Sequence, residues 1–219
     1  METTENTRIR LLLLDFDGTL ADTAAGILAT VKETFRRLGF QGADDERIRP
    51  TIGLVLEQSL QQIGDLSDAQ TRDAARLYRE IFPEYGEVNS SLFPGVPETL
   101  GELHARGYRM AIATSRGRES LEAIMAPYGV GGYFEEMVTA TDRLAPKPAP
   151  DMVLTLLARM NQPAGSTLVV GDTVYDMLMG SGAGCRTCGV TYGNQKETQL
   201  RTASPDHLIG SFAELLKLV

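Results

Sequence analysis

The chain has 219 residues, of which 42% are hydrophobic and 23% are charged, and its formal net charge is −8. This composition fits one large globular domain or a domain with an insert, and the negative charge argues against nucleic acid or an anionic membrane as a main partner. The apolar run near the start is too short to span a bilayer and lacks a cleavage pattern, so we expect a cytoplasmic protein.

The first predicted strand covers residues 8–14 and ends at two carboxylates. Residues 9–14 are apolar apart from Arg10, and Asp15 and Asp17 follow them, two residues apart. In an extended chain, residues i and i+2 point to the same side, and like charges on one side repel unless something neutralises them. Taken alone, Asp-x-Asp-Gly could equally be an ordinary acidic turn after a strand. The rest of the sequence is needed to distinguish a functional pair of carboxylates from such a turn.

A helical stretch without strand signals follows, between Thr23 and Ser91. Apolar residues recur there at helical spacing, and Gly39 and Gly64 stop the first two runs. The capping-box pair Ser67 and Gln70 opens a third helix. The sequence therefore predicts a helical module inserted directly after the first strand.

Strands and helices alternate over the rest of the chain. Strands are predicted at residues 108–113, 137–140, 167–170, 185–191 and 207–209. Helices are predicted at residues 96–103, 118–128, 152–160, 176–183 and 212–218. Such alternation predicts an α/β fold in which helices cover both faces of a parallel sheet.

The two cysteines, Cys185 and Cys188, have a Cys-x-x-Cys spacing that would suit a redox pair or half of a zinc site. The sequence has no second cysteine pair, and its two histidines, His104 and His207, lie far away along the chain. In a strand, residues i and i+3 face opposite ways. We therefore predict a structural role for both thiols.

Polar side chains gather where the predicted strands end, and open α/β sheets place their sites at the carboxyl ends of strands. These residues are Asp15, Asp17, Thr114, Ser115, Asp172 and Asp176, together with Lys147 in a proline-stiffened segment. Helix capping alone would explain one of Asp172 and Asp176, and the two would share a helix face if Asp172 opens that helix.

Four carboxylates in one cleft require a cation, and oxygen ligands without His or Cys favour Mg²⁺. Mg²⁺ pairs carboxylates with phosphate oxygens, and hydroxyls and a lysine can hold the remaining phosphate oxygens. A carboxylate that faces a neutralised phosphorus can attack it and form an aspartyl-phosphate. A second acid two residues further on can protonate the leaving alkoxide and later deprotonate water.

The sequence resembles the haloacid dehalogenase (HAD) superfamily, in its phosphoglycolate-phosphatase-like branch, over nearly the whole chain. Four motifs occur in order: residues 15–20, Thr114-Ser115, Lys147-Pro148 and residues 171–176. The resemblance implies a Rossmann-like catalytic core formed by residues 1–21 and 91–219, with an inserted α-helical cap at residues 22–90.

The resemblance also implies residue roles. Asp15 would be the nucleophile and Asp17 the acid/base, while Thr114, Ser115 and Lys147 would bind phosphate. Mg²⁺ would be held by Asp15, by the backbone carbonyl of Asp17 and by Asp172, with Asp176 acting behind them or through water. Arg49 and Gly53 lie where relatives place a substrate-contacting cap loop. Arg116 stands where many relatives carry Lys or Asn-Lys, and we interpret it as a solvated residue at a helix start.

These inferences predict a Mg²⁺-dependent phosphatase, a monomer or homodimer, that acts on a small phosphorylated metabolite such as a phosphoglycolate-like compound or a sugar phosphate. A sugar-phosphate mutase and an inorganic pyrophosphatase stay open as alternatives. A dehalogenase would lack the acid at Asp17, and a phosphonate hydrolase would need a cap lysine, for which only Lys32 is available. A receiver-type signalling module would combine similar groups, but it is shorter and has no helical insert after its first strand.

Overall fold

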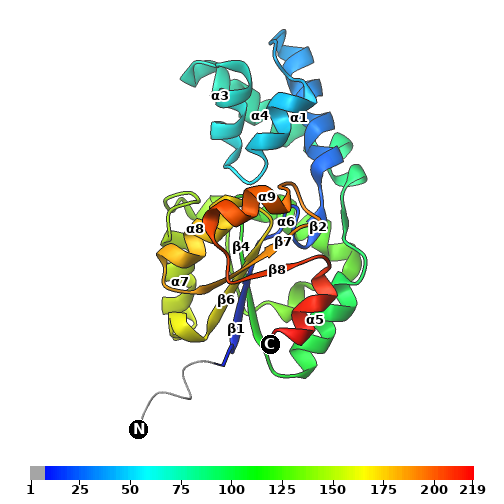
Figure 1. Ribbon diagram of the computed structural model, residues 1–219. Helices are drawn as coiled ribbons and strands as arrows, with labels where there is room; N and C mark the ends of the chain where they lie inside the picture. Colours follow the sequence, from blue (N-terminus) through cyan, green and yellow to red (C-terminus); the bar gives the residue numbers. More distant parts are fainter. Residues whose placement is uncertain (1–7) are drawn as a thin grey trace.

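A six-stranded parallel sheet forms the centre of the computed structural model, which describes residues 8–219 (Figure 1). Its strands are β1 (Leu11–Leu14), β4 (Arg109–Ala113), β5 (Glu136–Val138), β6 (Thr167–Gly171), β7 (Arg186–Val190) and β8 (His207–Ile209). They lie in the order β5-β4-β1-β6-β7-β8, and all neighbouring pairs are parallel. The predicted α/β fold is confirmed.

Strand β1 is central and buried on both faces. Its four leucines are fully buried, with Leu12 and Leu14 in one hydrophobic cluster and Leu11 and Leu13 in the other. Successive side chains of a strand point to opposite faces, so an uninterrupted run of leucines is what a strand between two helix layers requires.

Helices cover both faces of this sheet (Figure 1). Helices α5 (Val96–Ala105) and α6 (Arg118–Met125) bury their apolar residues in the cluster of Leu12, and α7 (Asp151–Arg159) and α8 (Val174–Gly182) contribute to the cluster of Leu11. A short helix α9 (Glu197–Leu200) follows β7. Short 3-10 helices cover Ala126–Tyr128, Gly131–Tyr133, Ala140–Asp142, Ala164–Ser166 and Arg201–Ala203.

The helix predicted at residues 212–218 is present as a 3-10 helix over Phe212–Lys217. Phe212 and Leu215 are its buried residues. They lie three positions apart, and a 3-10 helix aligns residues i and i+3 on one side, so this short segment buries both side chains without a longer α-helix.

A helical segment stands over the carboxyl-terminal edge of the sheet (Figure 1). It consists of α1 (Ala24–Leu38), α2 (Asp45–Ile48), α3 (Leu56–Gly64) and α4 (Asp68–Tyr85), with 3-10 helices at Arg49–Thr51 and Glu87–Asn89. The predicted capping box of Ser67 and Gln70 is confirmed at the start of α4. Helix α2 was not predicted, because its four residues are too few to show a helical period.

The chain enters and leaves this helical segment through a two-stranded antiparallel ribbon. Strand β2 (Ala21–Asp22) pairs with β3 (Ser91–Leu92). Gly39 ends α1 in a left-handed conformation, as predicted. Gly64, in contrast, is the last residue of α3, and Asp65 takes the left-handed conformation with φ of 49°, which Asp tolerates better than most residues.

The two cysteines lie in different clusters, which agrees with the structural role predicted for them. Cys185 belongs to the cluster of Leu11 and Cys188 to the cluster of Leu12. Burial raises the pKa of the Cys185 thiol to about 11 and that of Cys188 to about 12, so both stay protonated at neutral pH. Among residues 8–219, no helix has the length and apolarity that crossing a bilayer would require.

Candidate active site

The predicted acids and the predicted lysine meet at the carboxyl-terminal edge of the sheet. Asp15 follows β1 and Asp172 follows β6, and both are buried. The Lys147 ammonium donates to Asp15 Oδ1 and to Asp176 Oδ1, each at 2.6 Å. Segments that are up to 132 residues apart in sequence therefore share one buried ionic cluster.

This cluster carries more negative charge than Lys147 balances. Carboxylate oxygens of Asp15, Asp172 and Asp176 lie within 4.8 Å of one another. Burial raises the pKa of Asp15 to about 7, and the charges of Asp176 and Asp17 act in the same direction. Burial, followed by the charges of Asp15 and Asp176, also raises the pKa of Asp172 well above its ordinary value.

The pKa of Lys147 moves the opposite way. Burial lowers it, but the adjacent carboxylates of Asp15 and Asp176 outweigh that effect and raise it above its ordinary value. Lys147 is therefore a permanent cation at neutral pH. A further positive charge would stabilise the ionised forms of the three acids.

The donor set fits a hard cation. Asp172 Oδ2 accepts hydrogen bonds from the backbone N–H of Asn194 at 2.6 Å and from its side-chain amide at 2.8 Å. Asp172 Oδ1 is buried without a hydrogen-bond partner among the described residues. Buried polar atoms are normally paired, and an unpaired carboxylate oxygen beside another acid is the type of ligand that Mg²⁺ prefers.

Gly18 makes room for Asp172. It has a φ of +84°, and a Cβ atom there would lie 2.0 Å from Asp172 Oδ2. A Cβ on Gly193 would meet Asp172 Cβ at 2.4 Å. A side chain at residue 18 or 193 would therefore collide with Asp172. Glycine at both positions lets the backbone lie this close to the carboxylate.

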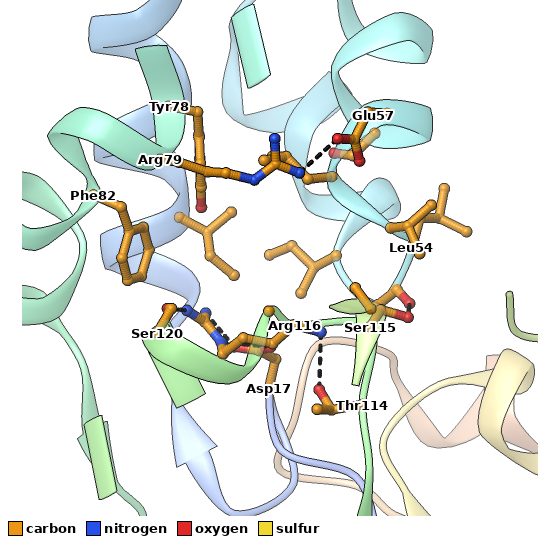
Figure 2. Close-up of a pocket in the computed structure, with 18 of the residues that line it drawn as sticks. Asp17, Leu54, Glu57, Tyr78, Arg79, Phe82, Thr114, Ser115, Arg116 and Ser120 are labelled. Carbon is orange, nitrogen blue, oxygen red and sulfur yellow. Dashed lines mark hydrogen bonds and ion pairs between the residues drawn. The ribbon is translucent and has the colours of Figure 1, made fainter. Parts of the chain in front are cut away.

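Asp17 is held by two other residues. Thr23 Oγ1 donates to Asp17 Oδ1 at 2.6 Å. Arg116 donates from Nη2 to the same oxygen at 2.6 Å and from Nε to Oδ2 at 3.0 Å. The guanidinium also lies 4.8 Å from the centre of the Phe82 ring and donates to Ser120 Oγ (Figure 2).

The interpretation of Arg116 as a solvated residue is therefore wrong. Its side chain is only 7% exposed. Arginine is usually exposed, but a carboxylate such as Asp17, whose side chain is 13% exposed, requires a partner. Pairing thus overrides the general preference of arginine for solvent.

Asp172 does not open helix α8. Thr173 is the N-cap, and its hydroxyl donates to Asp176 Oδ2 at 2.7 Å. The capping interpretation is thus correct for Asp176, whose second oxygen, Oδ1, binds Lys147. Asp176 therefore stabilises the start of α8 through Oδ2 and binds the Lys147 ammonium through Oδ1.

Of the other predicted site residues, Thr114 and Ser115 line the cavity at the sheet edge, whereas Arg49 does not. Ser115 Oγ donates to the backbone oxygen of Gly53 at 2.7 Å, which joins the sheet edge to the loop before α3. Thr114 Oγ1 accepts from the backbone N–H of Arg116 at 3.1 Å. Arg49 is exposed and is not among the cavity-lining residues, so its role in substrate contact stays a prediction without support from this arrangement.

A cavity of about 780 Å³ lies between the helical segment and the sheet edge (Figure 2). Asp15, Asp17, Thr114 and Ser115 line it from the sheet edge, and residues of α1, α3, α4 and the loop at 52–55 line it from the other side. Lys147 is buried beside Asp15. The arrangement can hold a phosphate against Asp15 and enclose the group attached to that phosphate.

Three residues that hold the acids were not predicted as site residues. Thr23 and Arg116 bind Asp17, and Asn194 binds Asp172. Asn194 lies shortly after β7, so the rule that found the other polar residues at strand ends could have found it. Arg116 follows β4 in the same way.

A lysine-bound acid cluster at the carboxyl edge of a parallel sheet, beside a cavity, is the arrangement expected of an active site in an α/β enzyme. Residues 12–190 match the family described as haloacid dehalogenase-like hydrolase, and the chain belongs to that family. The receiver-module alternative is therefore wrong.

Comparison with similar proteins indicates the class of enzyme. The chain is 37% identical to the probable phosphatase IndB of Dickeya dadantii, with 94% of this chain and 91% of that protein covered. It is 30% identical to a phosphoglycolate phosphatase of Vibrio parahaemolyticus, with 96% of each covered. A haloacid dehalogenase-like hydrolase from Bacteroides fragilis has a similar structure, with a TM-score of 0.90, 27% identity and coverage of 95% of this chain and 100% of that one. The chain is thus an enzyme, a HAD-family phosphatase similar to phosphoglycolate phosphatases.

Proposed function

We propose that this phosphatase uses Mg²⁺ to hydrolyse a small phosphorylated metabolite through an aspartyl-phosphate on Asp15. The observation that carries the proposal is the position of Asp15. It lines the cavity, and Lys147 binds its Oδ1 at 2.6 Å, which leaves Oδ2 available for attack on phosphorus. The ammonium also favours the ionised, nucleophilic form of the carboxylate.

In the first step, an Asp15 oxygen forms a bond to phosphorus while the bond from phosphorus to the leaving oxygen breaks. Asp17, in its acid form, gives its proton to that oxygen. In the second step, a water attacks the same phosphorus and loses a proton to Asp17, and the Asp15 carboxylate is released with inorganic phosphate. Thr23 and Arg116 keep Asp17 at the cavity wall through both steps.

The Mg²⁺ ligands in this proposal are Asp15, Asp172 and the backbone carbonyl of Asp17. Support comes from the unpaired oxygen of Asp172 and from the excess negative charge of the cluster. When bound, the ion supplies positive charge that stabilises the acids and the substrate phosphate together. Thr114, Ser115 and Lys147 are the proposed phosphate ligands, and Asp176 positions Lys147.

We further propose that residues 22–90 form a cap on a core made of residues 1–21 and 91–219. The β2–β3 ribbon at both ends of the segment and the contact of Ser115 with Gly53 support this division. Phosphoglycolate, which the names of relatives indicate as their substrate, belongs in the panel of compounds to be tested. The names of the relatives favour hydrolysis over the mutase and pyrophosphatase alternatives. A cytoplasmic location and a monomeric or homodimeric state stay predictions.

The test is release of inorganic phosphate from a panel of phosphorylated metabolites with and without Mg²⁺. The Asp15→Asn variant should lose turnover, because an amide is not a competent nucleophile, while Asp73→Asn on the exposed side of α4 should keep it. Mass spectrometry of the quenched enzyme should find phosphate on Asp15. Activity in Asp15→Asn, or phosphate trapped on Asp17, would contradict the assigned roles, and phosphate transfer without net release would indicate a mutase.

A further inference from the structure

The helical side of the cavity is largely apolar. Side chains from α1, α4 and the loop before α3 form this wall, and they include Ile27, Val31, Leu54, Val55, Phe82 and Pro83. Figure 2 shows the Leu54 loop and Phe82 on opposite sides of the space above Asp17. Asp15 and Asp17 thus lie at the floor of the cavity, where phosphate would bind, and these apolar side chains lie across the cavity from them.

The few charges on this wall do not favour an anionic leaving group. Of the lining residues contributed by the helical segment, all within the described part of the chain, Arg79 is the only cation, and it is paired with Glu57. Glu87 adds a second acid to the same wall. The carboxylate of phosphoglycolate, or a second phosphate, would therefore meet net negative charge on this wall, because the other arginines that line the cavity, Arg116, Arg118 and Arg143, belong to the core side.

The apolar wall is held over the acids. Ser115 Oγ binds the backbone oxygen of Gly53 at 2.7 Å, and a Cβ on Gly53 would lie 3.2 Å from Thr173. The loop that carries Leu54 therefore rests on the sheet edge. The cavity volume of about 780 Å³ belongs to this seated arrangement, and it falls within the range that encloses ligands of drug size.

One polar group is aimed into the apolar space. Tyr78 is buried, and its hydroxyl points into the cavity from α4 (Figure 2). Burial raises the pKa of this phenol above its ordinary value, so the hydroxyl stays neutral. It can exchange one hydrogen bond with an uncharged polar atom of the leaving group.

We infer that the substrate is a phosphomonoester whose leaving alcohol is uncharged and mainly apolar, with a body much larger than glycolate. This inference rests on the proposed phosphatase function and specifies its substrate class. It separates this chain from the relatives that are named phosphoglycolate phosphatases. The carrying observation is an acid cluster at the floor of a large cavity whose opposite wall is apolar and has no unpaired cation among the described residues.

The test uses the wild-type enzyme with Mg²⁺ and a series of n-alkyl phosphates from methyl to octyl, whose leaving alcohols have similar basicity. Each added methylene should raise kcat/KM about threefold to fourfold until the cavity is filled. Replacing the terminal methyl by a carboxylate should reverse that gain, and phosphoglycolate should be a poorer substrate than butyl phosphate. A flat series, or a preference for phosphoglycolate, overturns the inference.

Different results would reject the phosphatase function and the substrate class. If no ester of the panel, including p-nitrophenyl phosphate, releases phosphate, then the proposed function fails and not only its substrate class. If phosphate is released from all esters at equal rates, the function stands and the apolar class is wrong.

Leu54→Lys tests the wall directly, because it places a cation where the leaving group would lie. It should lower kcat/KM for octyl phosphate at least tenfold and raise it for phosphoglycolate. Leu154→Lys, on the outer side of α7 where the leucine is 48% exposed, is the matched control and should change neither value. Equal effects of the two substitutions would contradict the assigned wall, and the alkyl series remains decisive if Leu54→Lys fails to fold.

Discussion

Replacing Arg116 by alanine should destabilise the protein more than any ordinary surface substitution. The guanidinium is 7% exposed and donates to both carboxylate oxygens of Asp17, which is 13% exposed. Removing one partner of a buried pair typically costs about 3–5 kcal/mol, because the other charge is left without compensation. Asp17 keeps its hydrogen bond from Thr23 and lines the cavity, so we expect a loss of about 3 kcal/mol, near the lower end.

A double-mutant cycle separates the ion pair from lost packing. Arg116→Ala also removes the contact with Phe82, which is worth about 0.5–2 kcal/mol. Asp17→Asn removes the charge that Arg116→Ala leaves unpaired. The double variant should therefore be more stable than the sum of the single effects implies, with a coupling energy of about 2–3 kcal/mol.

The free energy of unfolding of the four proteins can be measured by urea denaturation. Arg118→Ala is the matched control, since Arg118 is 40% exposed and its nearest carboxylates lie at 3.7 Å and 3.8 Å; it should cost less than about 1 kcal/mol. A coupling energy below about 0.5 kcal/mol, the usual limit of additivity, would refute the view that Arg116 serves as the buried partner of Asp17.

Three other predictions concern the acids. Gly18→Ala should cost at least about 2 kcal/mol more than Gly107→Ala, because both glycines have φ above +80° but only the first approaches a carboxylate, that of Asp172; equal losses in urea denaturation would count against this packing. Because the folded-state pKa of Asp15 is raised to about 7, its contribution to stability is present below its ordinary pKa of 3.8 and is lost as pH rises through 7. In EDTA, Tm should therefore fall over that interval. Mg²⁺ at one fixed concentration, about 100 times its Kd at pH 8, should restore about 2.7 kcal/mol at pH 8 but less at pH 5, where protonated acids bind it more weakly; a Mg²⁺ effect independent of pH would argue against the acid cluster as the site. Asp17→Asn should lower the rate of phospho-enzyme breakdown more than it weakens substrate binding. An unchanged phospho-enzyme lifetime in rapid-quench kinetics would reject the acid/base role of Asp17.

The fold could be predicted because its main determinants are local. Four consecutive leucines can be fully buried in β1 only between two helix layers, and the capping box of Ser67 and Gln70 fixes the start of α4 through neighbouring residues. The short α2 escaped prediction, and the 3-10 type of the helix at Phe212–Lys217 could not be predicted, because tertiary contacts, not periodicity, decide such short segments.

The position of the site could be predicted for the same reason, but its internal pairing could not. Parallel strands bring their carboxyl ends to one edge, so Asp15 and Asp172 were expected to meet. The partner of Asp17 is Arg116, which lies 99 positions away in sequence. The place of Arg116 shortly after β4 could have assigned it to the site, but only the folded arrangement shows which carboxylate it meets.

The apolar cavity wall shows a further limit of hydrophobic patterns. Ile27 and Val31 have the helical spacing that predicts a face buried against other helices, and both also line the cavity. A periodic apolar face fills a core or bounds a binding site by the same pattern, since both require apolar residues on one side of the helix. The substrate preference inferred above therefore depends on residues whose sequence pattern predicts a core, and the alkyl phosphate series is the measurement that separates those two roles.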